Sequence, residues 1–376
     1  MALFEPVSER IIQVSAVIAT VTTEYFELSE EDRKRAETLH AEVTVIDGLV
    51  ATDAYLMDDD YRTHLPKGGV DAANFTVASY RDTFVSALEQ VNEIRRLTDN
   101  IDACIVEDVA DIRAATEADE TAVIMGFQDT KPIGNNRWKL SLFADLGVRV
   151  VQLTYNEQNY VCTGCCEEVD SGLSAFGREV VTTCNDRGIL LDLSHCGDRT
   201  TMDAIESSSD PVACTHVGFR ELCEAPGRNK TDQQLEALAD AGGVAGITLF
   251  PPLIKREGVS HRVVESTVTD VLDHIDYAVD LMGVDHVGIG TDLDDRSLDR
   301  GETPPTSALR HYRPSHPDVY GSGPTDVYDP YPDGVHRHTE LQTLTRGLVA
   351  RGYTDEEITK ILGGNFLRLF EAVWEN

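Results

Sequence analysis

The chain has 376 residues, of which 41% are hydrophobic, so one large barrel or two ordinary domains could form around a buried core. Asp and Glu outnumber Lys and Arg by 66 to 32, and the net charge of −34 argues against nucleic acids and anionic membranes as partners. Only 7 of the basic residues are Lys, and 25 are Arg. Such an acidic, Lys-poor surface predicts a halophilic protein, and an ordinary acidic protein is the alternative.

The N-terminus carries Glu5 and Glu9 ahead of its apolar stretch and lacks a basic segment, so we expect no secretory signal. No apolar run approaches the ~20 residues that would span a bilayer. The eight Cys imply no disulfide framework in a chain of this length, and we expect free thiols, including those of Cys162, Cys165 and Cys166. These features predict a cytoplasmic protein without membrane or nucleic-acid partners, and they leave a homodimer open.

Strand-like and helix-like runs alternate along most of the chain. The runs that predict strands are residues 43–48, 73–78, 122–127, 148–154, 188–193, 211–215, 243–249 and 286–291. The amphipathic runs that predict helices include residues 82–98, 136–146, 173–187, 199–208, 231–241 and 266–282. Eight strands, each followed by a helix or a long loop, predict an α/β fold of the (β/α)8, TIM-like barrel class. A doubly wound sheet is the alternative, but it would require a glycine-rich nucleotide loop after the first strand, and none is present.

The two ends of the chain predict additions to this barrel within a single domain of residues 1–376. Residues 1–40 are expected to form a helical N-terminal extension. Residues 296–338 contain seven Pro and predict a long loop after the last strand, placed where it could act as a lid over the barrel mouth. Residues 339–376 predict C-terminal helices that pack under the barrel.

Polar residues stand at the C-terminal ends of several predicted strands. His195 and His216 end the fifth and sixth strands, and Asp292 ends the eighth, while Gln128 and Tyr155 follow the third and fourth. A single His in such a position is more often structural, but the carboxyl ends of barrel strands converge on one site. Two imidazoles and a carboxylate suit Zn²⁺ or another divalent ion, and the carboxylate of Asp292 could accept a proton from water.

A basic residue in the loop after the sixth strand predicts recognition of an acidic substrate group. Arg228, followed by Asn229, could grip a substrate carboxylate with its planar guanidinium group. A surface ion pair is the alternative for this Arg. The sequence therefore predicts a small-molecule substrate that carries a carboxylate.

These residues lie within motifs that resemble the membrane (renal) dipeptidase family of zinc metallopeptidases, in the amidohydrolase superfamily. The resemblance runs from about residue 40 to the C-terminus and is carried by residues 172–181, 191–195, 215–216, 228–232, 242–244, 288–292 and 362–366. It implies a distorted (β/α)8 barrel that hydrolyses dipeptides with two zinc ions bridged by a carboxylate.

The resemblance also assigns roles to matching residues. His195 and His216 match the two histidines of the second metal site. Asp292 matches the aspartate that binds the first metal ion and accepts a proton. Arg228 matches the arginine that holds the terminal carboxylate of the substrate.

Three positions depart from the pattern of the family. The motif D-G-H-x-D after the first strand has Leu49 and Ala51 in place of its His and second Asp. Gln128 replaces the bridging Glu, and Tyr155 replaces a His that helps to bind substrate. Leu and Ala offer no lone pair, and a neutral amide is a poor bridge between two cations. The chain resembles a branch of the family with these replacements, and we expect one metal ion per chain, with Gln128 as a weak ligand.

We therefore predict a mononuclear, dipeptidase-like metallohydrolase that acts on a dipeptide or a small carboxylated amide, with Asp292 and Tyr155 as catalytic residues. A lyase or isomerase that acts on a small carboxylate is one alternative. A non-catalytic descendant that binds a small molecule or another protein is the other.

Overall fold

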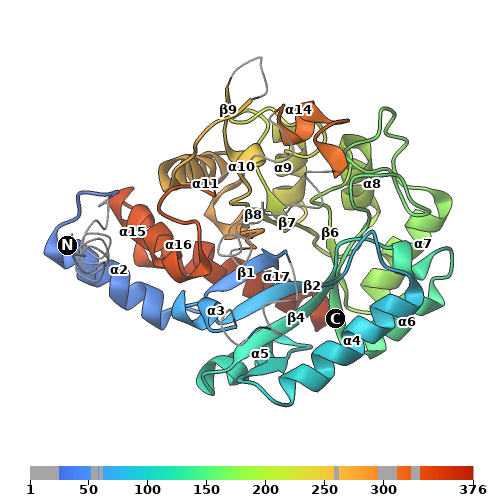
Figure 1. The fold of residues 1–376 in the computed structure, drawn as a ribbon, viewed down its shortest axis with the longest axis horizontal. Coiled ribbons are helices and arrows are strands. Elements are labelled where there is room, and N and C mark those ends of the chain that lie inside the picture. Colours follow the sequence, from blue (N-terminus) through green and yellow to red (C-terminus); the bar gives the residue numbers. More distant parts are fainter. Residues whose placement is uncertain are drawn as a thin grey trace, which may run out of the picture.

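The computed structural model describes residues 25–51, 58, 62–257, 262–294, 311–322 and 331–375. Eight parallel strands form a closed barrel (Figure 1), in the order β1 (Ile46–Val50), β2 (Ala72–Ala78), β4 (Thr121–Phe127), β5 (Val148–Gln152), β6 (Leu190–Asp192), β7 (Ala213–Val217), β8 (Val244–Ile247) and β11 (Val287–Ile289), which returns to β1. All eight overlap the predicted strands, so the predicted (β/α)8 class is confirmed. A further strand, β3 (Ala103–Ile105), pairs with the first half of β4 and was not predicted.

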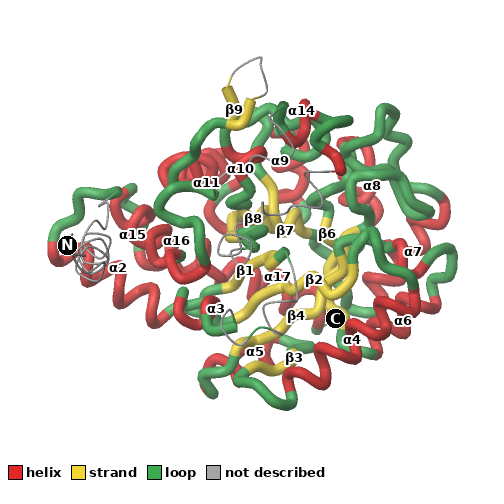
Figure 2. Tube along the Cα trace, in the orientation of Figure 1, coloured by secondary structure: helices red, strands yellow, loops and turns green. Residues whose placement is uncertain are grey.

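Helices surround the barrel (Figure 2). Those before β6 are α2 (Glu30–Glu42), α3 (His64–Lys67), α4 (Phe84–Thr98), α5 (Val109–Glu117), η2 (Lys131–Ile133), α6 (Trp138–Asp145) and α7 (Ala175–Asp186). Those after it are α8 (Asp198–Ser207), α9 (Asp232–Asp240), α10 (Pro251–Ile254), α11 (Val268–Met282), η4 (Val284–His286), α14 (Pro317–Tyr320), η5 (His338–Glu340), α15 (Gln342–Ala350), α16 (Asp355–Thr359), η6 (Lys360–Gly364) and α17 (Asn365–Trp374). The two-residue strands β9 (Arg256–Glu257) and β10 (Arg262–Val263) form an antiparallel pair.

Local sequence explains where these helices begin. Thr231 caps α9, because its side chain accepts a hydrogen bond from the backbone of Gln234, whose side chain bonds back to the backbone of Thr231. The same reciprocal arrangement precedes α4, between Thr83 and Ser86. These caps place the starts of α9 and α4 within two residues of the starts that the sequence predicted, at residues 231 and 82.

The bottom of the barrel is closed by α17. Phe366 and Phe370 of this helix lie in one buried apolar cluster with Ile46, Ile124 and Val150 of the barrel strands. Both phenyl rings are almost fully buried, and burial of each contributes about 2 kcal/mol. This end of the barrel is a packed core. A ligand-binding site is therefore expected at the opposite end.

Glycines in β8 and after β11 allow the backbone of β7 to approach these strands closely. A Cβ atom at Gly290 would lie 1.7 Å from the carbonyl oxygen of Thr215, and one at Gly246 would lie 2.1 Å from it. Only residues without a side chain permit this approach. The backbone at Thr215 is therefore held close to the barrel interior, and the residue after it is His216.

Parts of the predicted extensions lie outside the described residues. These are residues 1–24 of the N-terminal extension and residues 296–310 and 323–330 of the predicted lid. Residues 311–322 are described and pack Tyr312 and Tyr320 in one apolar cluster with Phe250 and Leu253. Within the described residues, no helix is long and apolar enough to cross a membrane.

Candidate active site

A cavity of about 140 Å³ opens at the C-terminal ends of the barrel strands. It brings together residues that the sequence placed at separate strand ends, and its walls are Ala51, Thr76, Ser79, Tyr80, Arg81, Gln128, Tyr155, His195, Arg228, Phe250, Asp292 and Tyr320. Ligand sites of barrel enzymes occupy this face of the fold.

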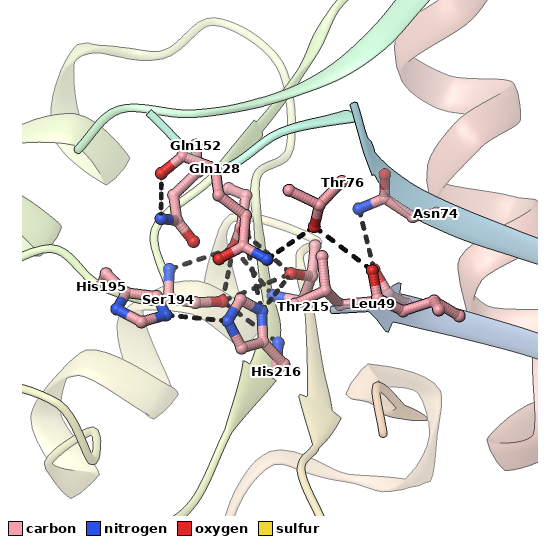
Figure 3. A network of polar contacts seen from close by, with 12 residues as sticks. Leu49, Asn74, Thr76, Gln128, Gln152, Ser194, His195, Thr215 and His216 are labelled. Atoms are coloured by element: carbon pink, nitrogen blue, oxygen red, sulfur yellow. Dashed lines mark hydrogen bonds and ion pairs between the residues drawn. The ribbon is translucent and has the colours of Figure 1, made fainter. Parts of the chain in front are cut away.

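Two buried imidazoles, of His195 in the cavity wall and of His216 behind it, face each other (Figure 3). Their Nε2 atoms are 3.0 Å apart. Nδ1 of His195 donates to Oδ1 of Asn156 at 2.7 Å, and Nδ1 of His216 donates to the hydroxyl of Thr215 at 2.8 Å, since that hydroxyl gives its proton to Asp192. With Nδ1 protonated on both rings, a neutral imidazole carries its lone pair on Nε2. The two Nε2 atoms lie within hydrogen-bond distance of each other, and both would present lone pairs to a metal ion in this tautomer.

The electrostatics keep both rings neutral. Burial lowers the pKa of His195 and of His216 well below the ordinary value, and the positive charge of Arg228 lowers both pKa values further. Zinc bound by His at 2.0–2.1 Å in tetrahedral geometry separates two ligand nitrogens by about 3.3 Å. The pair thus fits one metal ion with little adjustment.

A buried carboxylate fastens the ends of β6 and β7. Asp192 accepts from the backbone N–H groups of Ser194 and Thr215 at 3.0 and 2.9 Å, and also from the hydroxyls of both residues at 2.6 and 2.8 Å. The hydroxyl of Ser194 in turn accepts from the backbone N–H of His216 at 3.1 Å. Partners of this kind orient metal ligands without touching the ion.

The position of the first metal ion in the family does not fit a cation here. Leu49 and Ala51 stand at its ligand positions, and Gln128 donates from Nε2 to the hydroxyl of Thr76 at 2.6 Å, which donates to the carbonyl of Val50 at 3.2 Å. This neutral network occupies the β1, β2 and β4 side of the mouth (Figure 3). Among the described residues, no group of three or more His, Cys, Asp and Glu side chains could hold a metal ion.

Asp292 is the acidic side chain that lines the cavity. Its backbone has φ of 55°, in the left-handed region, and its N–H donates to the carbonyl of Leu49 at 3.0 Å. Burial raises the pKa of its carboxyl to about 7, although the charge of Arg228 opposes the rise. Such a group can accept a proton and return it near neutral pH.

Arg228 is a buried cation without an acidic partner among the described residues. It is 1% exposed, its Nη1 donates to the carbonyl of Ser194 at 3.1 Å, and its Nε has no partner. A buried guanidinium that forms no ion pair can bind an anion that enters the cavity. Asn229 does not line the cavity: its amide bonds to the backbone of Gly218, Cys223 and Leu253 and holds the loop.

Aromatic rings form one wall of the cavity. Tyr155 stacks on His195 with ring centroids 4.1 Å apart and on Tyr80 at 4.9 Å. Burial raises the pKa of Tyr155 well above its ordinary value, so its hydroxyl stays protonated and can donate a hydrogen bond. The loop that carries Tyr155 contains three of the cysteines, and all eight cysteines are free thiols, as expected.

Sequence reasoning missed several residues of this site, among them Tyr80, Asn156 and Tyr320. Tyr80 follows β2 and completes the stack, Asn156 orients His195, and Tyr320 reaches the cavity from α14. Asn156 immediately follows the predicted strand-end residue Tyr155, which was the available signal. Tyr320 had none, because its partner Asn156 lies 164 residues away in sequence.

The fold and the site define a (β/α)8-barrel hydrolase of the metal-dependent type. The family model "Membrane dipeptidase (Peptidase family M19)" matches residues 33–300, and the chain belongs to this family. An amidohydrolase from Pseudomonas aeruginosa is 33% identical, with a TM-score of 0.78 over 91% of this chain and 99% of that chain.

Curated relatives carry related names. Dipeptidase tcpJ of Claviceps purpurea is 29% identical over 82% of this chain and 64% of its own length. Dipeptidase 3 of Rattus norvegicus is 27% identical over 78% of this chain and 53% of its own length. The chain is thus matched to about half to two thirds of these relatives, and it is a dipeptidase-like metallohydrolase by family.

Proposed function

We propose that the protein hydrolyses a dipeptide or a similar small amide with one divalent ion, zinc or an ion like it, held by His195 and His216. The observation that carries this proposal is the 3.0 Å approach of the Nε2 atoms of His195 and His216 beside a cavity that also contains the buried guanidinium of Arg228. The amide oxygen of Gln128 or a water molecule would complete the ligand shell. When bound, the ion would acidify a water molecule and polarise the amide carbonyl.

The side chains of the cavity then divide the remaining work. Arg228 forms a bidentate pair with the terminal carboxylate of the substrate and orients the amide. Asp292 accepts a proton from the attacking water and returns it to the departing amine, while a bond forms from water oxygen to carbon and the carbon–nitrogen bond breaks. Tyr155 donates a hydrogen bond to the substrate.

The test is hydrolysis of a panel of L,L- and L,D-dipeptides in ¹⁸O-labelled water, with each C-terminus either free or amidated. We expect free dipeptides to be cleaved, with one ¹⁸O atom in the new carboxylate of the N-terminal amino acid. Amidated peptides should be poor substrates, because they offer Arg228 no anion. Absence of cleavage throughout the panel would contradict the proposal.

The neutral network of Gln128, Thr76 and Val50 favours a second candidate, because it removes the second cation of the family mechanism. A lyase or isomerase would convert a small carboxylate without incorporation of ¹⁸O from the solvent. A binding descendant would retain the ligand through Arg228 without turnover. The labelled-water experiment separates hydrolysis from the other two functions, and binding of a small carboxylate with or without its conversion separates those two.

We further propose a cytoplasmic protein adapted to high salt, on the strength of the net charge of −34 and the scarcity of Lys. Repulsion among these carboxylates should weaken the fold in dilute buffer, and salt screens it. The midpoint of thermal unfolding should rise steeply between 0.1 and ~2 M KCl. A midpoint that does not change with salt would contradict the proposal.

A further inference from the structure

One amide oxygen connects the metal-binding side of the cavity to a segment far along the chain. Oδ1 of Asn156 accepts from Nδ1 of His195 at 2.7 Å, from the hydroxyl of Tyr320 at 2.9 Å and from the thiol of Cys165 at 3.2 Å. Asn156 is fully buried, and its Nδ2 has no hydrogen-bond partner among the residues that the structure describes. Its φ of 67° lies in the left-handed region, which Asn tolerates better than most residues do.

The orientation of this amide determines which nitrogen of His195 is available. With Oδ1 toward the ring, Nδ1 carries the proton and Nε2 presents its lone pair toward His216. With the amide reversed, Nδ2 would donate to Nδ1, and the proton of a neutral ring would move to Nε2. A protonated Nε2 cannot bind a metal ion, so the amide must be kept from reversing.

Tyr320 is placed to prevent this reversal. It ends α14, is 2% exposed, and its ring stacks on Tyr312 at 5.8 Å and meets Phe250 edge-on at 6.3 Å. These rings hold the hydroxyl in place. A phenol is a better donor than acceptor, so it favours the amide oxygen over the amide nitrogen at this position.

We propose that Tyr320 and Asn156 are positioning residues, which together hold His195 in the tautomer that binds metal through Nε2. This inference rests on the proposed function and deepens it, because it makes the segment of residues 311–322 part of the metal site without giving it a ligand. Partners of metal ligands typically change metal affinity by about 10- to 100-fold when they are removed.

The experiment compares four variants with the unaltered protein. Tyr320→Phe removes the hydroxyl and keeps the ring. Asn156→Asp replaces the amide by a carboxylate, both of whose oxygens are acceptors, so that no reversal can occur. The double variant combines the two changes. Tyr312→Phe is the matched control, because it removes a hydroxyl from the same segment that bonds to Glu157 at 3.3 Å instead.

Two readouts are measured on each protein after circular dichroism has verified its fold. The ¹⁵N chemical shifts of the His195 ring in the metal-free protein report its tautomer. The dissociation constant for Zn²⁺, from competition with a chromophoric chelator, reports the consequence. Tyr320→Phe should populate the Nε2–H tautomer and weaken zinc binding about tenfold. Tyr312→Phe should leave both readouts unchanged.

The double variant distinguishes positioning from a merely structural role. Since a carboxylate cannot present a donor, Tyr320→Phe should have no further effect on either readout when Asn156→Asp is present. Equal losses from Tyr320→Phe in both backgrounds, or an unchanged tautomer in Tyr320→Phe, would overturn the inference. Failure of the unaltered protein to bind zinc would overturn the proposed function, whereas the tautomer measurement needs no metal and still tests the inference.

Discussion

At the mouth of the barrel, the ends of β1 and β6 are fastened to other strands by the same device. Asp192 accepts from the backbone N–H of Ser194 and from both the N–H and the hydroxyl of Thr215. Asp47 likewise accepts from the N–H of Leu49 at 3.1 Å and from the N–H and hydroxyl of Thr291 at 2.8 and 2.6 Å. We call each of these Asp residues with its hydrogen-bond partners a clamp. Asp47 and Asp192 are almost fully buried, and each is followed within four residues by a residue that lines the cavity, Ala51 or His195.

The two sides differ in the side chains that the clamps support. On the β6 and β7 side these are His195 and His216, which fit a metal ion. On the β1 side they are Leu49 and Ala51, which cannot. The carboxylates that hold the strands are distinct from the residues that would bind metal, so the ligands of one site can be lost while the barrel closes unchanged. The following predictions test this comparison.

The largest effect is expected from removal of an imidazole on the β6 and β7 side. His216→Ala leaves one nitrogen ligand, and we expect loss of bound metal and at least about a 100-fold loss of activity, more than is typical for removal of an outer partner. His286→Gln is the control, since His286 bonds to the carbonyl of Gly243 and does not line the cavity. Metal analysis and kcat/KM check both variants, and full metal content in His216→Ala would contradict the assignment.

Arg228→Lys should raise KM for free dipeptides by about 10- to 100-fold, because a point charge replaces the bidentate fork. The KM of any slowly cleaved amidated peptide should change little. Arg220→Lys serves as a control, because Arg220 pairs with Asp198 outside the cavity. Equal effects on free and amidated substrates would show that Arg228 does not recognise the carboxylate.

Asp292 should link activity and stability to pH in opposite directions. Its pKa in the folded protein, about 7, lies above the unfolded value near 4, so the folded state binds the proton more tightly and stability falls as pH rises from 4 through 7. Activity should fall as pH drops below about 7, because the carboxylate is then protonated.

Asp292→Asn should therefore be less active, yet more stable at pH 8 by about 1–2 kcal/mol, after allowance for the partial exposure of the side chain. Urea unfolding at pH 4 and pH 8 measures this, and the gain should disappear at pH 4. A variant that is destabilised at pH 8 would contradict the account.

The smallest change is expected when metal-binding side chains are restored on the β1 side. Metal content should then rise about twofold. The triple variant Leu49→His, Ala51→Asp, Gln128→Glu restores the donor types of the family pattern on a clamp that is already present. We expect metal content to rise from about one to about two ions per chain. Gln128→Glu alone, which lacks the other two donors, should leave it unchanged. No gain in the triple variant would mean that the clamp alone does not preserve the site.

The sequence was sufficient for the barrel because its signals are local. Each buried strand is a short apolar run, and the eight predicted runs overlap the barrel strands. The three-residue strand β3 and the helix α5 that follows it were missed, since a short strand beside the ring has no distinctive pattern.

The candidate site was only partly accessible from sequence. His195, His216, Arg228 and Asp292 could be located because each stands at a strand end or in the loop after one, and the structure brings all four together. Asn229 was expected to bind substrate, but its amide is used by the loop backbone. The link between Asn156 and Tyr320 depends on a left-handed residue and a contact across 164 positions, which no local pattern encodes.

The most direct test is the metal content per chain of the unaltered protein after equilibration with Zn²⁺ and removal of free ion, measured by plasma mass spectrometry against amino-acid analysis. The account predicts about one zinc ion per chain, held on the β6 and β7 side alone. Two ions per chain would show that the β1 side still binds metal despite Leu49, Ala51 and Gln128, and none would show that the imidazole pair does not. Either result would contradict the account.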